Sequence, residues 1–319
     1  MKTVAITGIS GYIGSKLLAQ LDKVGEVEKI IGLDIKPPKV SSGKLKFYPQ
    51  NVLEPFEHIF RENQVDSAIH LAFVLKPTHN RAGAWQIDIK GSRNFLEACS
   101  QAQVKHILYL SSHTVYGAHP ENTAPLKEDS PLRPVPGFQY SWDKAEVEKL
   151  FQGFASSRED VCLTILRVCP VIGPNAGKSV VTSMFRPLML FVAGYDPPLQ
   201  FVHEDDLVRV ILTFLRRRIG GIFNVAGEGE IRYSEVARLC RSKTISLPGK
   251  LLHFLMSFSW KLHLQNESPP EGLEFIKYPP LVDTQKLKSE AGFRFNYSSK
   301  DAVASFVDSY LTKKKRNCL

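Results

Sequence analysis

The sequence predicts an α/β protein, a doubly wound parallel sheet followed by a smaller C-terminal domain. Short β-branched runs alternate with helical patterns through the first half of the chain, and this regularity weakens beyond about Cys169, where prolines and long polar connections appear. Strands that alternate with helices form βαβ units, whose strands pair in parallel and whose helices cover both faces of the sheet. We therefore expect residues 1–168 and 199–228 to form the sheet domain, and residues 169–198 and 229–319 to form the smaller domain.

Two kinds of hydrophobic pattern distinguish the expected elements. The first strand, TVAIT at Thr3–Thr7, is a continuous β-branched run of the kind that is buried on both faces of a sheet. The first helix, Tyr12–Leu21, places Ile13, Leu17 and Leu21 on one face. By the same criteria, the further strands are Lys29–Asp34, 44–48, 65–72, 104–111, Cys162–Val168 and 222–226, and the further helices are 85–100 and 140–154.

Composition excludes several classes of protein. The net charge is +9 over 319 residues, but the cations are scattered and form no stripe with aromatic side chains, so we expect no nucleic-acid partner. The five cysteines include no CxxC pair and no zinc-ligand spacing, which predicts free thiols, no metal and a reducing compartment. No apolar run reaches the roughly 18 residues of a membrane span, and the N-terminus is a strand, not a signal peptide. These features indicate a cytoplasmic protein.

A glycine-rich turn joins the first strand to the first helix. The run TGISGYIG at 7–14 contains Gly8, Gly11 and Gly14. The first glycine allows the tight turn, the second lets the backbone approach a pyrophosphate, and the third lets the helix pack closely on the strand. The helix N-terminus then offers unpaired N–H groups and the positive end of its dipole to the anion. In this strand–turn–helix context the glycines predict a Rossmann-type dinucleotide site.

An acidic residue ends the second strand. Asp34 follows Gly14 by twenty residues, where a carboxylate accepts hydrogen bonds from the adenosine ribose hydroxyls and repels a 2′-phosphate. This favours NAD over NADP, a preference that the nearby Lys36 softens. The alternative interpretation of Asp34 is a solvated acid at the end of a strand.

A tyrosine and a lysine stand four residues apart at the start of an expected helix. Tyr140 and Lys144 therefore lie on one face, where an ammonium would lower the pKa of a phenol toward that of a usable base. Alone, this spacing is also typical of a solvated helix face. The run SSHTVYG at 111–117 strengthens the functional interpretation, because it ends the fifth strand, and ligands bind at the carboxyl ends of parallel strands.

Together these motifs make the chain resemble the extended short-chain dehydrogenase/reductases of the NAD-dependent epimerase/dehydratase group, such as UDP-glucose 4-epimerases. The resemblance covers residues 3 to about 227 and implies bound NAD that oxidises a secondary alcohol, transiently or as a net reaction. The motifs are TGxxGxxG at 7–14, the acid at 34, HLA at 70–72, SSxxVYG at 111–117, YxxxK at 140–144, LR at 166–167 with GP at 173–174, FVHEDD at 201–206 and FNVAG at 223–227.

The resemblance also implies roles for single residues. Ser112 is implied as the catalytic hydroxyl, Tyr140 as the base, and Lys144 as both the group that tunes the phenol pKa and a ligand of the nicotinamide ribose. His203 is expected to be structural, because the acids after it begin a helix. A homodimer through a helix bundle that includes the Tyr140 helix is implied as well. The implied cofactor-binding residues are Gly8, Gly11, Tyr12, Ile13, Gly14, Asp34, Asn51, Val52, Leu71, Ala72, Tyr140 and Lys144.

The chain departs from the family pattern mainly where substrate is held. Asp88 stands where the family often has Asn, and Pro170 replaces an Asn that often contacts substrate in nucleotide-sugar epimerases. The run PPLQ at 197–200 stands where the family usually has glycines and an Arg that grips the substrate diphosphate. Arg186 and Lys178 are candidates to replace that Arg.

The substrate therefore stays open between two classes. The first hypothesis is a sugar-nucleotide epimerase or dehydratase, because the motif set resembles that group most. The second is an NAD-dependent dehydrogenase of an apolar alcohol, such as a steroid or another lipid-like substrate. A third is a non-catalytic dinucleotide-sensing module, against which the joint presence of Ser112, Tyr140 and Lys144 argues.

Two C-terminal segments have more than one interpretation. The run GKLLHFLMSFSWKLHL at 249–264 is expected to be a packed helix of the smaller domain, with a lid over an apolar substrate or a membrane-surface helix as alternatives. A loop is expected at 267–272. The basic tail after Thr312 is expected to be a frayed solvated end, with contact to anionic lipid as the alternative.

Overall fold

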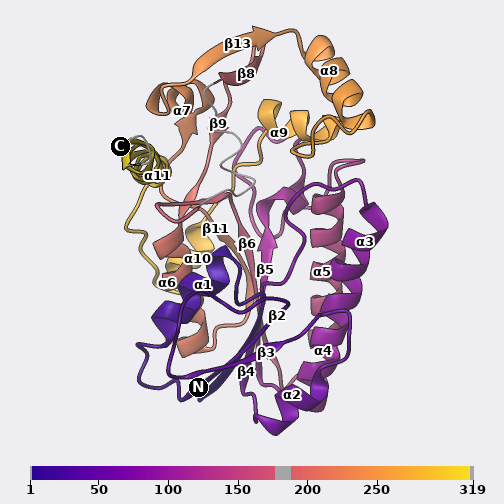
Figure 1. The fold of residues 1–319 in the computed structure, drawn as a ribbon, viewed down its shortest axis with the longest axis vertical. Helices are drawn as coiled ribbons and strands as arrows, with labels where there is room; N and C mark the ends of the chain where they lie inside the picture. Colours follow the sequence, from indigo (N-terminus) through magenta and orange to yellow (C-terminus); the bar gives the residue numbers. More distant parts are fainter. Residues whose placement is uncertain (1, 177–187, 317–319) are drawn as a thin grey trace.

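A computed structural model describes residues 2–176 and 188–316, and within the last helix it describes no side chains at 311 and 313–316. Its centre is a parallel sheet of seven strands in the order β11-β6-β5-β4-β1-β2-β3 (Figure 1). This confirms the expected α/β class. The strands are β1 Thr3–Thr7, β2 Lys29–Asp34, β3 Leu45–Pro49, β4 Ser67–His70, β5 His106–Ser112, β6 Cys162–Val168 and β11 Gly221–Val225.

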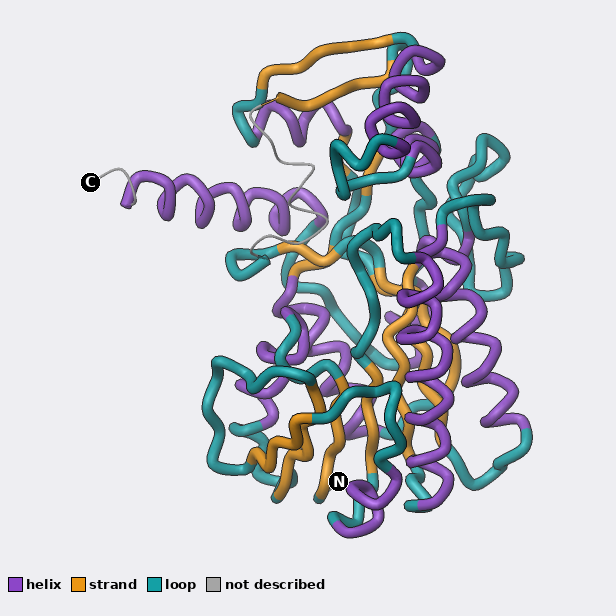
Figure 2. The backbone as a smooth tube through the Cα atoms, turned by 45° about the vertical axis from the view of Figure 1, so that its right-hand side comes forward, coloured by secondary structure: helices purple, strands orange, loops and turns teal. Residues whose placement is uncertain are grey.

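Helices cover both faces of this sheet, as the backbone view in Figure 2 shows. Val4 and Ile6 of β1 pack in one hydrophobic cluster with the helices α1 (Tyr12–Leu21) and α6 (Glu204–Arg217). Ala5, between them, packs in the opposite cluster with α2 (Glu57–Glu62), α4 (Gly91–Gln101) and α5 (Gln139–Ser156). Alternate residues of one strand therefore serve two cores, which is why the strand sequences are apolar throughout.

The order of the strands reverses beside β1. From β1 the chain runs outward to β2 and β3, then returns to the other side of β1 and runs outward through β4, β5, β6 and β11. The carboxyl ends of β1 and β4 therefore flank a crevice, which is where open α/β sheets bind ligands. The backbone hydrogen bond from Leu71 N to Thr7 O, 3.1 Å long, joins the two strand ends.

One expected helix is divided in the structure. Residues 85–100 were predicted as a single helix, but the chain forms α3 (Arg81–Trp85), a five-residue π-helix η1 (Gln86–Lys90) and then α4. A π-helix is a local widening that side-chain periodicity does not reveal, and such widenings occur frequently at functional sites. This one carries Asp88 into the interior, where it is 1% exposed.

The C-terminal part packs over the carboxyl edge of the sheet, at the upper end of the molecule in Figure 1. A parallel pair, β8 (Leu188–Val192) and β13 (Lys243–Leu247), carries the helix α8 (Gly249–Lys261) at its end. The other elements are η2 His113–Tyr116, β7 Val171–Ile172, β9 Pro198–Leu199, β10 Val202–His203, β12 Ile231–Arg232, α7 Tyr233–Leu239, η4 Pro270–Leu273, α9 Glu274–Lys277, α10 Gln285–Glu290 and α11 Ser299–Arg316.

Two expectations for the C-terminal part are wrong. The segment 267–272 is not only loop, because η4 begins within it, where two consecutive prolines restrict the backbone. The backbone after Thr312 does not fray but continues the helix α11 to Arg316. Across the described residues, none of the helices combines the length and the apolar character needed to cross a bilayer.

Candidate active site

The glycine turn has the geometry that a pyrophosphate requires. Gly8 has φ +73°, and a Cβ on it would lie 2.7 Å from the backbone nitrogen of Ala72. A Cβ on Gly14 would collide with the carbonyl oxygen of Gly8, and one on Gly11 would lie 3.1 Å from the same oxygen. No side chain caps the first turn of α1, which leaves its N–H groups available to an anion. The turn therefore fits the dinucleotide predicted for it.

Asp34 lies beside this turn at the end of β2. Its Oδ2 accepts a hydrogen bond from the Ser10 N–H at 3.0 Å, and the Ser10 hydroxyl donates to the backbone oxygen of Lys36 at 2.5 Å. The carboxylate is thus held against the glycine turn while remaining half-buried. A second oxygen stays available for a ribose hydroxyl, as the sequence predicts.

The first turn of α1 is anchored to the start of α6. The Tyr12 hydroxyl donates to the Glu204 carboxylate, and Lys16 Nζ lies 2.7 Å from the same carboxylate. Burial and this carboxylate raise the pKa of Tyr12, so its phenol is neutral and structural. Ile13 packs against the core between sheet and helices. Because both side chains have other contacts, the cofactor-binding roles implied for Tyr12 and Ile13 would belong to their backbone atoms.

The residues implied to flank adenine and line the cofactor surround the same crevice. Val52 is buried, and its carbonyl oxygen accepts a 2.8 Å hydrogen bond from Asn94 Nδ2 on α4. Asn51 is exposed and its Oδ1 accepts from Leu53 N at 3.0 Å. Leu71 and Ala72, both half-buried, leave β4 directly opposite Gly8. The structure therefore places Leu71 and Ala72 against the glycine turn, whereas Asn51 and Val52 follow β3.

Ser112 and Tyr140 meet at the carboxyl end of β5. The Ser112 hydroxyl accepts from Thr114 N at 3.2 Å and from Thr114 Oγ1 at 3.0 Å, which fixes its rotamer at the start of η2. Tyr140 stands in the first turn of α5, with its ring edge-on to Phe73 at 5.8 Å. Burial raises the pKa of Tyr140 to about 12, and its hydrogen bond with Ser112 acts in the opposite direction.

Lys144, implied to tune the phenol, is buried beside an aromatic ring and a backbone carbonyl. Its Nζ donates to the Leu110 carbonyl oxygen at 2.6 Å and lies 3.7 Å from the centre of the Phe73 ring. Burial lowers the pKa of Lys144 itself, while the Asp88 and Glu148 carboxylates act to raise it. For Lys144, the cost of burying the ammonium therefore outweighs its attraction to the two carboxylates, and the net shift of its pKa is downward.

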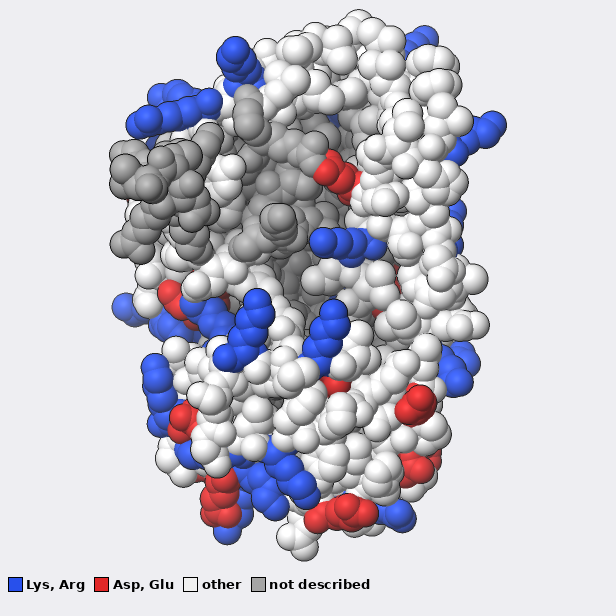
Figure 3. Space-filling model, in the orientation of Figure 1, with Lys and Arg blue, Asp and Glu red and all other residues white. Residues whose placement is uncertain are grey.

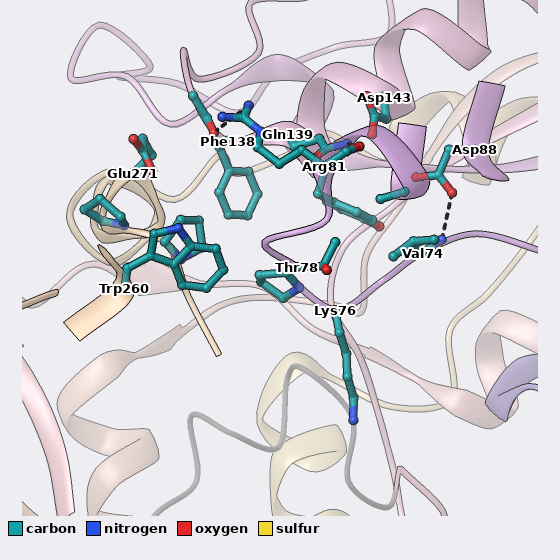
Figure 4. Close-up of a pocket in the computed structure, with 16 residues that line it drawn as sticks. Val74, Lys76, Thr78, Arg81, Asp88, Phe138, Gln139, Asp143, Trp260 and Glu271 are labelled. Carbon is teal, nitrogen blue, oxygen red and sulfur yellow. Dashed lines mark hydrogen bonds between the residues drawn. The ribbon is translucent and has the colours of Figure 1, made fainter. Parts of the chain in front are cut away.

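Asp88 is a site residue to which sequence reasoning assigned no role. Its Oδ1 accepts from Val74 N at 2.8 Å (Figure 4), and the charge of Lys144 acts to lower its pKa. Burial raises the pKa of Asp88, and the proximity of Asp143 acts in the same direction. The sequence shows an acid at position 88, where the family often has Asn. Only the π-helix, however, places this acid beside Lys144.

A buried polar network holds the helix α5, which carries Tyr140 and Lys144, against the sheet. Glu148 pairs with Arg167 at 2.5 Å and accepts a 2.8 Å hydrogen bond from Ser111. Arg167 also donates to the Tyr116 hydroxyl at 2.8 Å, which donates to Asn224 Oδ1 at 2.8 Å. Four of the motif segments, SSxxVYG, LR, FNVAG and the helix of YxxxK, thus meet in one network that fixes the positions of β5, β6, β11 and α5.

A cavity of about 130 Å³ opens in front of Tyr140 and Asp88 (Figure 4). Arg81 of α3 reaches across it to the Gly137 carbonyl oxygen at 3.4 Å, and Trp260 of α8 closes the opposite side. No sequence motif pointed to Arg81, whereas Trp260 belongs to the 249–264 segment for which a lid over an apolar substrate was one of the alternatives. The lining consists of Val74, Lys76, Pro77, Thr78, Arg81, Ala84, Asp88, Gly137, Phe138, Gln139, Tyr140, Asp143, Trp260, Pro269, Pro270 and Glu271.

The segment that usually grips a diphosphate has a different contact here. The Gln200 side chain accepts from Val282 N at 2.8 Å and donates to the Val282 carbonyl oxygen at 3.2 Å, so it holds backbone. Lys178 and Arg186 lie outside the described residues. His203 begins α6, where its Nδ1 accepts from Asp205 N at 3.2 Å, which confirms its structural role.

Comparisons with known proteins agree with this fold. An uncharacterised protein of Mycobacterium bovis is 24% identical over 313 residues, covering 96% of this chain and 83% of the relative. A UDP-glucose 4-epimerase of Yersinia enterocolitica is 30% identical over 261 residues, 70% of this chain and 77% of the relative. The crystal structure of a UDP-glucose 4-epimerase of Thermotoga maritima with UDP-glucose superposes with a TM-score of 0.78, at 20% identity over 98% of this chain and 99% of the other.

The model of one protein family matches residues 4–226, the same span that carries the motifs and the crevice. That span covers more than half of the chain and includes the glycine turn, Asp34, Ser112, Tyr140 and Lys144. The chain belongs to the NAD-dependent epimerase/dehydratase family.

Proposed function

We propose that this protein is an NAD-dependent enzyme that oxidises a secondary alcohol of a nucleotide sugar, transiently as an epimerase or as the first step of a dehydration. The observation that carries the proposal is the assembly of Ser112, Tyr140 and Lys144 at the carboxyl end of β5, beside a glycine turn that fits a pyrophosphate. A non-catalytic sensor would have no use for this arrangement. Bound NAD would supply the hydride acceptor.

Four side chains of the site would each have a separate role in this reaction. The Ser112 hydroxyl, already oriented by Thr114, would hold the substrate oxygen. The Tyr140 phenol would exchange a proton with that oxygen as the carbon is oxidised or reduced. Lys144, when charged, would favour the phenolate and bind the nicotinamide ribose through its ammonium. Asp88 faces Lys144 and would help to keep this ammonium protonated.

The substrate class is inferred from relatives and from the cavity. The Yersinia enterocolitica relative is a UDP-glucose 4-epimerase, and so is the solved Thermotoga maritima neighbour, whose structure contains UDP-glucose. The cavity offers polar groups suited to sugar hydroxyls, including Thr78, Gln139 and Asp143. Its wall also contains Phe138 and Trp260, which keeps a dehydrogenase of an apolar alcohol as the second candidate.

Two organisational features belong to the same proposal. We infer that residues 1–168 with 199–228 bind the cofactor and that the remainder binds the substrate. We also infer a homodimer through α4 and α5, on whose surface Trp142 is 44% exposed.

The experiment first measures NAD binding by calorimetry, then presents UDP- and dTDP-sugars and hydroxysteroids. Product stereochemistry is followed together with NADH absorbance, since an epimerase regenerates NAD. Tyr140→Phe is expected to lower kcat by about 10²–10⁴-fold, whereas Tyr310→Phe, on exposed surface, serves as the control. Full turnover by Tyr140→Phe would refute the proposed base, and turnover of hydroxysteroids alone would select the second candidate.

A further inference from the structure

The helix α8 exposes an apolar face that the rest of the described chain leaves uncovered. Phe254 is 63% exposed and Phe258 is 54% exposed. These rings and Leu251, Leu255 and Leu262 follow the spacing i, i+3, i+4, i+7 and i+11, so they form one stripe along the helix. The packed helix that the sequence predicts at 249–264 is present as α8, but protein covers only its opposite face.

The opposite face of α8 is fixed to the protein. Leu252 is 2% exposed and packs with Val192 of β8 and Leu273 of η4. Met256 adds to the same cluster, and Trp260 lines the cavity in front of Tyr140. The helix is therefore already folded and oriented, with its second apolar stripe directed outward.

The charge around the exposed stripe has one sign. Lys250 and Lys261 are both exposed and stand three helical turns apart, so they lie on the same flank of the stripe. From residue 236 to residue 266 the chain has no Asp or Glu. Within that segment the cations are Arg238, Arg241, Lys243, Lys250 and Lys261.

The helix α8 lies at the outside of the molecule, where a flat partner surface can contact its exposed stripe. The helix lies near one end of the long axis of the molecule, beside the pair β8–β13 (Figure 1). Leu190 and Ile245, which face each other across that pair, are exposed as well. The space-filling view shows uncharged atoms over this end, with lysines and arginines at its margin (Figure 3).

We propose that α8 is a membrane-docking helix, which lies on an anionic lipid bilayer with its exposed stripe among the acyl chains and its lysines at the headgroups. A folded amphipathic helix with aromatic residues on one face and cations beside it has the chemistry of an interfacial helix. The helix has 13 residues and would lie in the plane of the surface.

Charge argues for a bilayer over a second copy of this chain. In a symmetric contact between two α8 helices, the Lys250 and Lys261 flanks would face an equally cationic surface, with no acid between residues 236 and 266 to pair with them. An anionic headgroup layer complements both the charge and the apolar stripe. The docked protein would keep the Trp260 side of its cavity close to the lipid.

The test is sedimentation of the full chain with vesicles of phosphatidylcholine alone or mixed with phosphatidylglycerol. We expect binding to the mixed vesicles that weakens as salt rises, because headgroup attraction is screened. The double variant Phe254→Ser/Phe258→Ser should bind about tenfold or more weakly, because two rings no longer enter the acyl region. Lys250→Glu/Lys261→Glu should lose the preference for anionic lipid.

Controls separate this inference from its alternatives. Ile35→Ser, at an apolar residue that is 68% exposed on another part of the surface, should leave vesicle binding unchanged. Both α8 variants should retain wild-type circular dichroism and NAD affinity. Equal vesicle binding by wild type and Phe254→Ser/Phe258→Ser would overturn the proposal, as would binding lost only when the cations at 313–316 are changed to Gln. An α8-dependent dimer that binds no vesicles would identify the stripe as an interface between copies.

Discussion

The Ser10 N–H donates to the Asp34 carboxylate at 3.0 Å, so the acid that ends β2 is held directly against the glycine turn. The glycine turn and the end of β2 are separate in the sequence, but this hydrogen bond holds them together. A dinucleotide bound at the turn would therefore meet an acid whose position is already set, and pre-orientation reduces the entropy lost on binding.

Replacing Asp34 with Ala is expected to weaken NAD binding by about tenfold or more, since a hydrogen bond to a charged group contributes about 1.5–3 kcal/mol. Discrimination against NADP should shrink at the same time, because the carboxylate that repels a 2′-phosphate is gone. Calorimetry with both cofactors measures the two effects.

Glu28→Ala provides the matched control for that change. Glu28 stands just before β2, at the end away from Asp34, and pairs with Lys2 on the surface. Its replacement by Ala removes the same charge as Asp34→Ala, but away from the glycine turn. Equal effects of the two substitutions on NAD affinity would refute the assigned role of Asp34.

The third glycine of the turn allows a steric test. Gly14→Ala would place a methyl group against the Gly8 carbonyl oxygen, and overpacking of this kind costs about 1–3 kcal/mol of unfolding free energy. Gly25→Ala, where a Cβ meets nothing within 4 Å, should change stability by less than about 0.5 kcal/mol. Urea unfolding compares the two variants, and a neutral Gly14→Ala would contradict the packing described for the turn.

The sequence predicts the sheet well because each strand is buried on both faces. The bounds of β1, α1, β2 and β6 agree with those expected, since continuous apolar runs and a one-sided helical stripe have few other interpretations. The π-helix at Gln86–Lys90 could not be predicted, because such a widening leaves no periodic signal in the sequence.

The sequence predicts that Tyr140 and Lys144 lie together, but it predicts neither the presence of Asp88 beside Lys144 nor the electrostatics of the site. The spacing of Tyr140 and Lys144 indicates that they share a face, yet the depth of burial decides which way their pKa values move. For α8, hydrophobic periodicity shows an apolar face without showing whether protein covers it.

Asp143 gives a pH dependence that can be measured. Its carboxyl is 4% exposed, and burial raises its pKa to about 6, against which a hydrogen bond from Gln139 acts. The folded protein therefore binds more protons than the unfolded chain between about pH 4 and pH 6, so this group lowers stability as pH rises through that window.

Asp143→Asn should consequently be more stable than wild type above about pH 6, by at most about 3 kcal/mol, and equally stable below about pH 4. Unfolding by urea across this range measures the difference. Asp129→Asn, at an exposed site, is the control. A constant difference between Asp143→Asn and wild type at every pH would show that the carboxyl does not titrate in this window.

The buried pair Glu148–Arg167 is expected to dominate the stability of the catalytic helix. Glu148 and Arg167 are 0% and 3% exposed, so Glu148→Gln would leave a guanidinium buried without its counter-charge, at a cost of about 3–5 kcal/mol. Glu146→Gln breaks the solvent-exposed pair with Lys149 on the same helix and should cost less than about 0.5 kcal/mol. Thermal unfolding ranks the variants. Similar losses in both would mean that Arg167 is satisfied by its bonds to Tyr116 and the Glu128 backbone, and that the ion pair adds little to the network.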